Sequence, residues 1–249
     1  MFLGINYILK LIEQANLSET LYAWINQSAL WIMLVFYFFY RKMHRIHWLK
    51  ALIAAYLLHQ CVSYGASFTM WAEAGFTSSY RGNYAAGFMY APLGCWLLSV
   101  LLRVPCKKLG DFLAPVPLIM HGFFRIACIM AGCCRGIPAD WGIYNTYYGT
   151  YDFPVTFLEA LISFGITGYL IWRFRRNRCE ADGKSMSLML ILYGTARFIT
   201  EFLRVGEKIL LGLSVDSFHA MLMCAVGTVI LLCMRRTSGS KQPSPKGKG

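Results

Sequence analysis

Residues 192–204 carry three charges inside an otherwise hydrophobic run and read Leu192-Tyr193-Gly194-Thr195-Ala196-Arg197-Phe198-Ile199-Thr200-Glu201-Phe202-Leu203-Arg204. In a helix, Arg197, Glu201 and Arg204 fall at i, i+4 and i+7, so they share one face. Tyr193 stands one turn earlier on the same face. The pattern predicts a polar stripe on an apolar helix, and such a stripe needs partners inside the protein.

Two interpretations of this stripe compete. A structural ion pair at a helix end would need no function, because an arginine near a membrane boundary can reach water with its long side chain. Arg197, however, follows an apolar segment and precedes further apolar residues, so we expect it to lie below the lipid head groups. A second arginine, Arg125, stands in another apolar segment. Ionisable residues at such a depth usually mark a functional site.

The composition indicates an integral membrane protein. The 249 residues are 57% hydrophobic and 14% charged, whereas soluble domains have about 25% charged residues. The mean hydropathy is +0.47. The length allows about seven spans of about 20 residues, which leaves no room for a separate soluble domain. The net charge of +12 lies in short clusters between apolar runs, so it indicates membrane topology and no nucleic-acid partner.

Nine cysteines are an odd number, and most of them fall inside apolar segments, where cysteine behaves as a small hydrophobic residue. A disulfide framework is therefore not expected. Cys128, Cys133 and Cys134 crowd one predicted helix end, but no further Cys/His pair stands nearby at ligand spacing. We therefore predict no metal site and no cofactor.

The hydrophobic segments predict an all-α, polytopic fold with about seven transmembrane helices. They cover residues 21–40, 51–71, 85–102, 111–134, 154–172, 186–203 and 215–234. Pro115, Pro117 and Gly122 predict a kinked or partly unwound fourth segment. A short amphipathic helix is expected over residues 6–16, and residues 135–153 are expected to form an interfacial loop. Residues 1–236 then form a single membrane domain, and residues 237–249 a disordered basic tail. No removable signal peptide is recognised at the N-terminus.

The distribution of positive charge predicts the orientation. The loops after the first, third, fifth and seventh segments hold 17 of the 24 Lys and Arg residues. The positive-inside rule therefore places the N-terminus outside and the C-terminus in the cytoplasm. With that topology Arg125, Arg197 and Glu159 all lie near mid-bilayer or in its outer half, at about 1.5 Å per residue from the helix ends. We expect one cavity to hold all three.

Two arginines and a glutamate in a hydrophobic cavity suit an anionic lipid head group. Arginine holds phosphate with a planar fork and stays charged at every relevant pH. Glu201 is expected to orient Arg197, and Arg204, nearer the surface, to guide the lipid inward.

Several motifs resemble those of the prolipoprotein diacylglyceryl transferase family. The segment Tyr193-Gly194-x-x-Arg197-x-x-x-Glu201-Phe202-x-Arg204 resembles the family's sixth-helix motif. Asp111-Phe112-x-Ala114-Pro115 followed by Arg125-Ile126-x(9)-Gly136 is similar to its fourth-helix signature. Pro154-x(4)-Glu159 is similar to the family's His-Pro-x-Gln-x-Tyr-Glu segment. The resemblance covers residues 111–222, nearly half of the chain.

The resemblance implies an activity and a place. The family transfers a diacylglyceryl group from phosphatidylglycerol to the lipobox cysteine thiol of preprolipoproteins, at the outer side of the bacterial cytoplasmic membrane. It implies that Arg125 and Arg197 are essential arginines. We expect the catalytic group to be Arg125, Arg197, Glu201 and His121. The substrate-binding residues expected beside them are Tyr193, Arg204, Glu159, Tyr90 and Gly136.

The chain also departs from the family pattern. The family has Gly-Asn and Asn-Gly-Glu where this chain has Ala127-Cys128 and Ala131-Gly132-Cys133, so an amide and a carboxylate are missing. Its third-helix His-Gly-Gly aligns with Tyr90-Ala91-Pro92, so a histidine is missing too. His121 stands four residues before Arg125 on the same helical face. It is either a hydrogen-bonded packing residue or the base that takes the thiol proton.

Two further functions remain open at the level of sequence. A diverged paralogue would use the same phospholipid pocket for transfer to another thiol, an amine or a hydroxyl, and the missing amide and carboxylate favour it. A non-enzymatic lipid-binding or transport protein would keep only the fold, but no internal repeat or pair of matching broken helices supports transport. Activity on a lipobox peptide separates the three.

Overall fold

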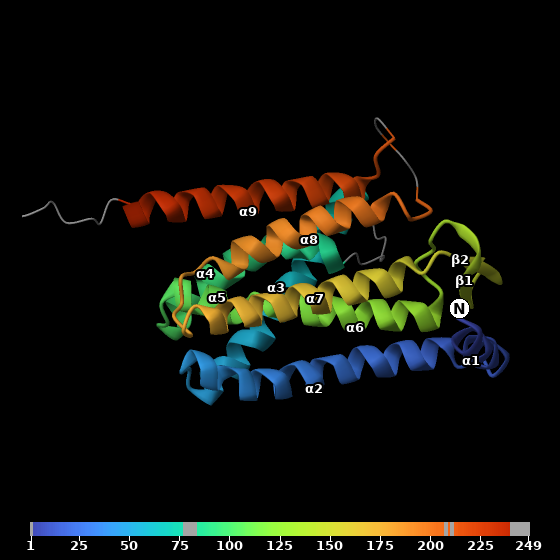
Figure 1. The fold of residues 1–249 in the computed structure, drawn as a ribbon, viewed down its shortest axis with the longest axis horizontal. Coiled ribbons are helices and arrows are strands. Elements are labelled where there is room, and N and C mark those ends of the chain that lie inside the picture. The colour runs from blue at the N-terminus through green and yellow to red at the C-terminus, as the bar shows by residue number, and fades with distance from the viewer. Residues whose placement is uncertain (1, 77–83, 207–208, 210–211, 240–249) are drawn as a thin grey trace, which may run out of the picture.

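The computed structural model describes residues 2–76, 84–206, 209 and 212–239. Most of the chain forms long helices that lie side by side along one axis (Figure 1). In chain order the described elements are α1 (Leu3–Gln14), α2 (Ser18–His44), α3 (Trp48–Glu73), the 3-10 helix η1 (Tyr84–Tyr90), α4 (Ala91–Leu102), α5 (Cys106–Leu113), α6 (Pro115–Ala131), β1 (Pro138–Asn145), β2 (Thr150–Asp152), α7 (Val155–Arg176), α8 (Ser185–Glu201) and α9 (Val215–Gly239).

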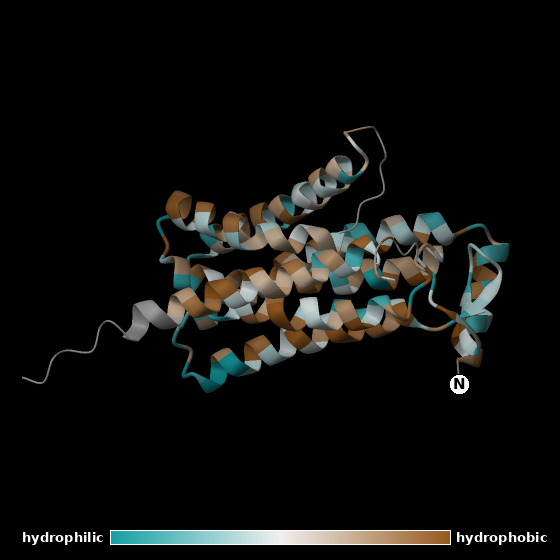
Figure 2. Ribbon diagram, turned by 90° about the horizontal axis from the view of Figure 1, so that it is seen from above, coloured by the Kyte–Doolittle hydropathy of each residue, from teal (hydrophilic) through white to brown (hydrophobic). Residues whose placement is uncertain are grey.

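Within the described residues, five helical segments are long and apolar enough to cross a membrane. They are Ser18–His44, Tyr84–Leu102, Cys106–Ala131, Val155–Arg176 and Val215–Met234. Hydrophobic residues follow the length of the rods, and hydrophilic ones gather toward their ends (Figure 2). On α2, Trp24, Trp31 and Phe39 are 58–71% exposed. Large apolar side chains exposed on the outside of a helix bundle are typical of a surface that faces lipid.

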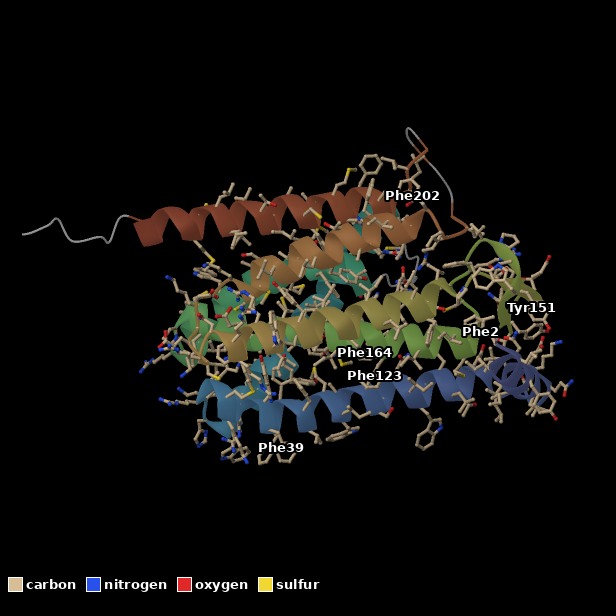
Figure 3. All side chains as sticks on the ribbon, viewed as in Figure 1. Phe2, Phe39, Phe123, Tyr151, Phe164 and Phe202 are labelled. Atoms are coloured by element: carbon tan, nitrogen blue, oxygen red, sulfur yellow. The ribbon has the colours of Figure 1, made fainter. Side chains whose placement is uncertain are left out.

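The core lies where α6 packs against α2 and α7, with α8 and α9 paired beside them. Phe123 of α6 and Phe164 of α7 lie edge to face, with ring centroids 5.4 Å apart (Figure 3). Gly122 does not interrupt α6, contrary to the sequence expectation. A Cβ there would lie 2.6 Å from the ring of Phe164, so the glycine is required by close packing of α7. The predicted kink is a junction at Ala114, between α5 and α6.

A two-stranded antiparallel sheet corrects the all-α prediction. Strands β1 and β2 pair within the segment that was expected to be an irregular loop, with Tyr144 opposite Tyr151 and Asn145 opposite Thr150. Helix α1 fastens to this hairpin through Asn6, whose amide donates to Gly142 O at 3.1 Å and accepts from Tyr144 N at 2.9 Å. The hairpin therefore sits at the same end of the bundle as α1 (Figure 1).

Asp111 ties the start of α8 to α5. Its two carboxylate oxygens accept hydrogen bonds from Gly183 N at 2.7 Å and Ser185 N at 2.8 Å. These amides precede and begin α8, where backbone N–H groups have no helical partner. The bonds fix where α8 begins, and with it the height of Arg197 along the bundle.

At the other end, α9 continues as a helix to Gly239. The expected tail starts at residue 237, and its residues 240–249 lie outside the described part of the chain. Residues 207–208, which belong to the loop used in the charge count, and Arg81 also lie outside it.

Candidate active site

Glu159 is the centre of the polar cluster. It stands on α7 and is 2% exposed. Arg125 of α6 places Nε 2.7 Å from its Oε2, Arg197 of α8 places Nη1 against its Oε1, and Arg204 places Nη1 3.3 Å from its Oε2. Thr200 donates a further hydrogen bond to Oε1 at 3.2 Å. One buried carboxylate therefore joins three arginines from two parts of the chain, Arg125 of α6 and Arg197 and Arg204 at and just after the end of α8.

Arg197 contacts two more carboxylates. Its Nη2 lies 3.1 Å from Glu201 Oε2 and 2.5 Å from Asp216 Oδ2, which belongs to the first turn of α9. The Arg197 side chain is only 2% exposed. Burying a guanidinium this far from water is costly unless carboxylates and hydrogen bonds compensate it. The predicted Arg197–Glu201 pair thus exists, but within a larger network.

Arg204 does not continue the helical stripe. Helix α8 ends at Glu201, and Arg204 instead forms an isolated antiparallel bridge with Gly136. Its side chain still turns back to the cluster, with Nε 3.8 Å from Glu201 Oε2. At 14% it is the most exposed of the three arginine side chains, compared with 9% for Arg125.

His121 is buried next to Arg125, and its hydrogen bonds define its tautomer. Ser163 Oγ donates to the carbonyl of Glu159 at 2.8 Å, so it accepts from Nδ1 of His121 at 2.9 Å. Nε2 is then an acceptor, with Arg125 Nε at 3.0 Å and the Tyr193 hydroxyl at 2.9 Å. This assignment comes from the network of partners. Both nitrogens of the ring are therefore bonded to neighbours.

Two cavities meet at Arg125. The larger, about 810 Å³, is lined by charged residues that include Arg125, Arg197, Glu201, Arg204 and Asp216. The smaller, about 450 Å³, runs between α2, α3 and α6 and is lined by residues that include Leu30, Ala66, Met120, His121 and Phe124. Of the three residues expected to share one cavity, Arg125 and Arg197 line the larger one, whereas Glu159 is not among its described lining residues.

The remaining predicted residues lie elsewhere. Tyr90 is not among the described residues that line either cavity, and its hydroxyl instead bonds Thr69 Oγ1 at 3.0 Å. Gly136 is a structural position, because a Cβ there would lie 2.2 Å from the carbonyl oxygen of Phe153. Asp216 was missed by the sequence reasoning, since an acidic residue in a first turn is ordinarily explained by the helix dipole.

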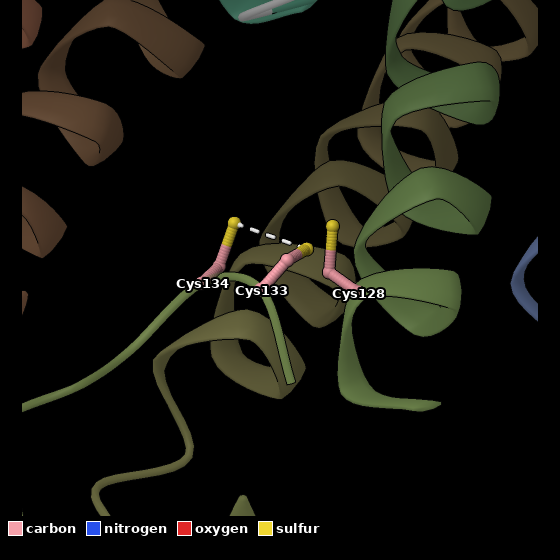
Figure 4. A group of neighbouring side chains, drawn as sticks. All are labelled: Cys128, Cys133 and Cys134. Carbon is pink, nitrogen blue, oxygen red and sulfur yellow. Dashed lines mark hydrogen bonds between the residues drawn. The ribbon is translucent and has the colours of Figure 1, made fainter. Parts of the chain in front are cut away.

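Three cysteines complete the surroundings of Arg125. Cys128, Cys133 and Cys134 have sulfur atoms within 4.8 Å of one another (Figure 4). Arg125 Nη1 lies 3.1 Å from the sulfur of Cys134. Thiols in this arrangement are potential metal ligands.

Comparison with known proteins identifies the family. A family model described as prolipoprotein diacylglyceryl transferase matches residues 82–233, more than half of the 249 residues, and this range contains the whole arginine–carboxylate cluster.

Curated relatives agree with this match. The chain is 27% identical over 161 residues to phosphatidylglycerol--prolipoprotein diacylglyceryl transferase 2 of Clostridium perfringens, covering 62% of each chain. It is 33% identical over 104 residues to the phosphatidylglycerol--prolipoprotein diacylglyceryl transferase of Clostridium tetani, covering 39% of this chain and 41% of the relative. A Dehalococcoides mccartyi transferase of the same name is 24% identical over 155 residues, or 57% of each chain. The chain thus spans about three-fifths or less of the length of these relatives. On the family match, the chain belongs to the prolipoprotein diacylglyceryl transferase family.

Proposed function

We propose that this protein transfers the diacylglyceryl group of phosphatidylglycerol to the lipobox cysteine thiol of preprolipoproteins. The observation that carries the proposal is the cluster of three arginines on one buried glutamate, which lines a cavity within the family-matched segment. The relatives' names supply the two substrates. The cavity supplies a place where a lipid phosphate meets fixed positive charge.

Arg204 and Arg125 are the groups that contact the phosphate. The contacts of Arg204 with carboxylates are long, at 3.3 and 3.8 Å, and its side chain is partly exposed to the cavity. Its guanidinium can therefore turn to an anionic oxygen without leaving a carboxylate unpaired, because Glu159 keeps Arg125 and Arg197. Arg197, bound by three carboxylates, holds the cluster together and does not need to reach the lipid.

The reaction is a displacement at carbon. The acceptor thiol loses its proton to solvent, its sulfur attacks the glyceryl carbon that bears the phosphate ester, a C–S bond forms and the C–O bond breaks. The electron pair stays on the phosphate oxygen, and glycerol phosphate leaves. Arginines close to that oxygen stabilise the charge that develops on it. The 450 Å³ cavity beside Arg125 is lined by apolar side chains such as Leu30, Met120 and Phe124 and by polar ones, and we assign it to the part of the lipid that carries the acyl esters.

His121 orients Arg125 in this proposal. The sequence suggested that it acts as the base, but its Nε2 already accepts from Arg125 and Tyr193. A group whose lone pair is bound by two donors in the protein interior is a poor proton acceptor. It is well placed to hold the guanidinium of Arg125 in one orientation.

The membrane arrangement that fits this chemistry has seven spans. Besides the five long apolar segments, α3 and α8 run alongside the others and complete the set (Figure 1). The basic loops after α2, α4 and α7 then face the cytoplasm, and the arginine cluster and the hairpin lie toward the outer leaflet. In this proposal the protein resides in the bacterial cytoplasmic membrane.

The test is a transfer assay with the purified full chain in phosphatidylglycerol vesicles. A lipobox peptide should gain one diacylglyceryl group, read by mass spectrometry, and the same peptide with serine in place of cysteine should not. Transfer to serine or to a peptide amine would replace this function with that of a diverged paralogue. Lipid binding without transfer to any acceptor would overturn an enzymatic function.

A further inference from the structure

The turn after α6 brings three cysteines together. Gly132 ends α6 with φ of +63°, which reverses the chain, and a Cβ there would lie 2.5 Å from Asn145 Oδ1. Cys133 and Cys134 therefore fold back over the last turn of α6, which carries Cys128 (Figure 4). Glycine is the residue that takes this left-handed conformation without strain.

The spacing of the sulfur atoms fits a tetrahedral metal ion. The sulfurs of Cys133 and Cys134 are 3.9 Å apart, and all three lie within 4.8 Å. In a zinc–thiolate site, bonds of about 2.3 Å place neighbouring sulfurs about 3.8 Å apart. Small side-chain rotations would bring the third sulfur to that separation.

The surroundings hold this geometry in place. The loop after Cys134 is fastened by Arg135, whose Nε lies 3.2 Å from both carboxylate oxygens of Asp152, and Asp152 also accepts from Asn145 Nδ2 at 3.1 Å. Arg125 Nη1 donates toward the sulfur of Cys134. Donors of this kind orient thiolate ligands and offset their charge.

One side of the group is open to substrate. Cys133 and Cys134 line both the 810 Å³ and the 450 Å³ cavity, and Cys133 is exposed. Catalytic zinc sites have three protein ligands and an open fourth position, whereas structural zinc sites have four protein ligands.

Within the arginine cluster, the groups that could take a thiol proton are already bound. Glu159 contacts three arginines, Glu201 and Asp216 contact Arg197, and His121 Nε2 accepts from Arg125. A metal would remove the need for a base, because a thiol that coordinates zinc is deprotonated outright.

We propose that Cys128, Cys133 and Cys134 bind Zn²⁺ and that the acceptor cysteine occupies the fourth position as a thiolate. This inference rests on the proposed function, for which it names the means of activating the acceptor. Each ligand thiol releases one proton to solvent when zinc binds, and so does the acceptor thiol. The zinc-held sulfur attacks the glyceryl carbon, the C–O bond breaks toward the phosphate, and the neutral thioether leaves the metal.

Cobalt binding tests the site without turnover. The full chain, reduced and freed of metal in detergent, is titrated with Co²⁺ alone. One equivalent should produce a thiolate-to-cobalt charge-transfer band and tetrahedral ligand-field bands, and Zn²⁺ should displace it. A lipobox peptide with cysteine should strengthen the charge-transfer band, and the serine peptide should not. Absence of the cobalt bands in the reduced wild-type chain would overturn the proposal.

Substitution of the three cysteines tests whether they are the ligands of the metal. Cys128→Ser, Cys133→Ser and Cys134→Ser should each weaken cobalt binding by about tenfold or more. The matched control is Cys179→Ser, an exposed cysteine in the loop between α7 and α8, which should bind as the wild type does. Cys133→His should retain cobalt with a weaker charge-transfer band, which separates loss of a ligand from loss of the fold.

The transfer assay separates the two proposals. Equal transfer by metal-free and zinc-loaded wild-type chain would overturn the zinc role and leave the proposed function intact. A three-thiolate cobalt spectrum without transfer by either form would overturn the proposed function instead. Transfer that is lost on metal removal and restored by Zn²⁺ supports both.

Discussion

The substitution Arg197→Lys tests whether the site needs the planar fork of donors of a guanidinium or only a positive charge. Its guanidinium bridges Glu159, Glu201 and Asp216, and a lysine ammonium at that position cannot reach all three. We expect Arg197→Lys to lower the transfer rate by about a hundredfold, because the cluster around Arg125 and Arg204 shifts. The folded protein should persist, read as a cooperative thermal transition.

Arg204→Lys is the matched comparison. Lysine keeps a point charge that still binds phosphate, and Arg204 makes only long contacts with carboxylates. We expect kcat/KM to fall by less than about tenfold, mainly through KM. This corresponds to less than about 1.4 kcal/mol of binding free energy. Equal losses of rate in the two variants would contradict the different positions assigned to these arginines.

His121→Gln tests whether the imidazole orients Arg125 or takes a proton. A glutamine amide can accept from Arg125 and donate to Ser163, but it cannot act as a base. In our assignment the variant keeps its transfer rate within about tenfold and its pH profile is unchanged. A general base would contribute about a hundredfold or more. A loss of that size in kcat, with a changed pH profile, would restore His121 as the base.

At this scale the sequence identified most of the cluster. Arg125, Arg197 and Glu159 were found because charges inside apolar segments are rare and expensive. Asp216 was not found, because an acid at a helix start needs no tertiary partner to explain it. The sequence already brought Cys128, Cys133 and Cys134 to one helix end, but the chain reversal at Gly132, which places their sulfurs within 4.8 Å, is a tertiary feature that spacing does not reveal.

Among the elements, the contact between Gly136 and the hairpin sets the position of Arg204. Gly136 pairs with Arg204, and its Cα approaches the backbone of Phe153 so closely that a Cβ would lie 2.2 Å from the carbonyl. Gly136→Ala should displace this bridge, lower the unfolding temperature and reduce transfer. Because the neighbour is backbone, it cannot move aside as a flexible side chain would.

Gly165→Ala is the control. It lies within α7, and no heavy atom comes within 4 Å of the added Cβ. Alanine favours a helix over glycine by about 1 kcal/mol, so this variant should be as stable as the parent or more so. If both variants unfold at the parent temperature, Gly136 is not required for close approach of the backbone.

The helices were predictable from hydrophobic length alone, to within a few residues at most ends. The hairpin was not, because Pro138, Gly142 and Asp140 interrupt any alternation of polar and apolar residues. The β1–β2 pairing depends on tertiary contacts such as Asn6 with Tyr144, which connect residues far apart in the chain. Likewise, the end of α8 at Glu201 follows from the pairing of Arg204 with Gly136.

In the whole molecule, the basic residues that follow α2, α4 and α7 lie at the end of the bundle opposite to the hairpin. Arg45, Arg103 and Arg176 mark the ends of α2, α4 and α7 at one end of the bundle, whereas α1 and the hairpin mark the other (Figure 1). The positive-inside rule predicts from this that the hairpin lies outside. The proposed function requires this orientation, because a lipobox cysteine delivered outside must reach the site.

Labelling of cysteines in oriented membrane vesicles tests this arrangement. Cys179 is exposed in the loop after α7, and Trp141, 58% exposed on β1, can be replaced in Trp141→Cys. A membrane-impermeant maleimide should label residue 141 in right-side-out vesicles and Cys179 in inside-out vesicles, with the labelled residue read from peptide masses. Detergent should expose both, which controls for reactivity. The opposite pattern would place the arginine cluster toward the cytoplasm, where a lipobox cysteine delivered outside could not reach it. Labelling of both residues from one side would require an even number of crossings between the hairpin and the loop after α7, whereas the continuous helix α7 between them supplies one.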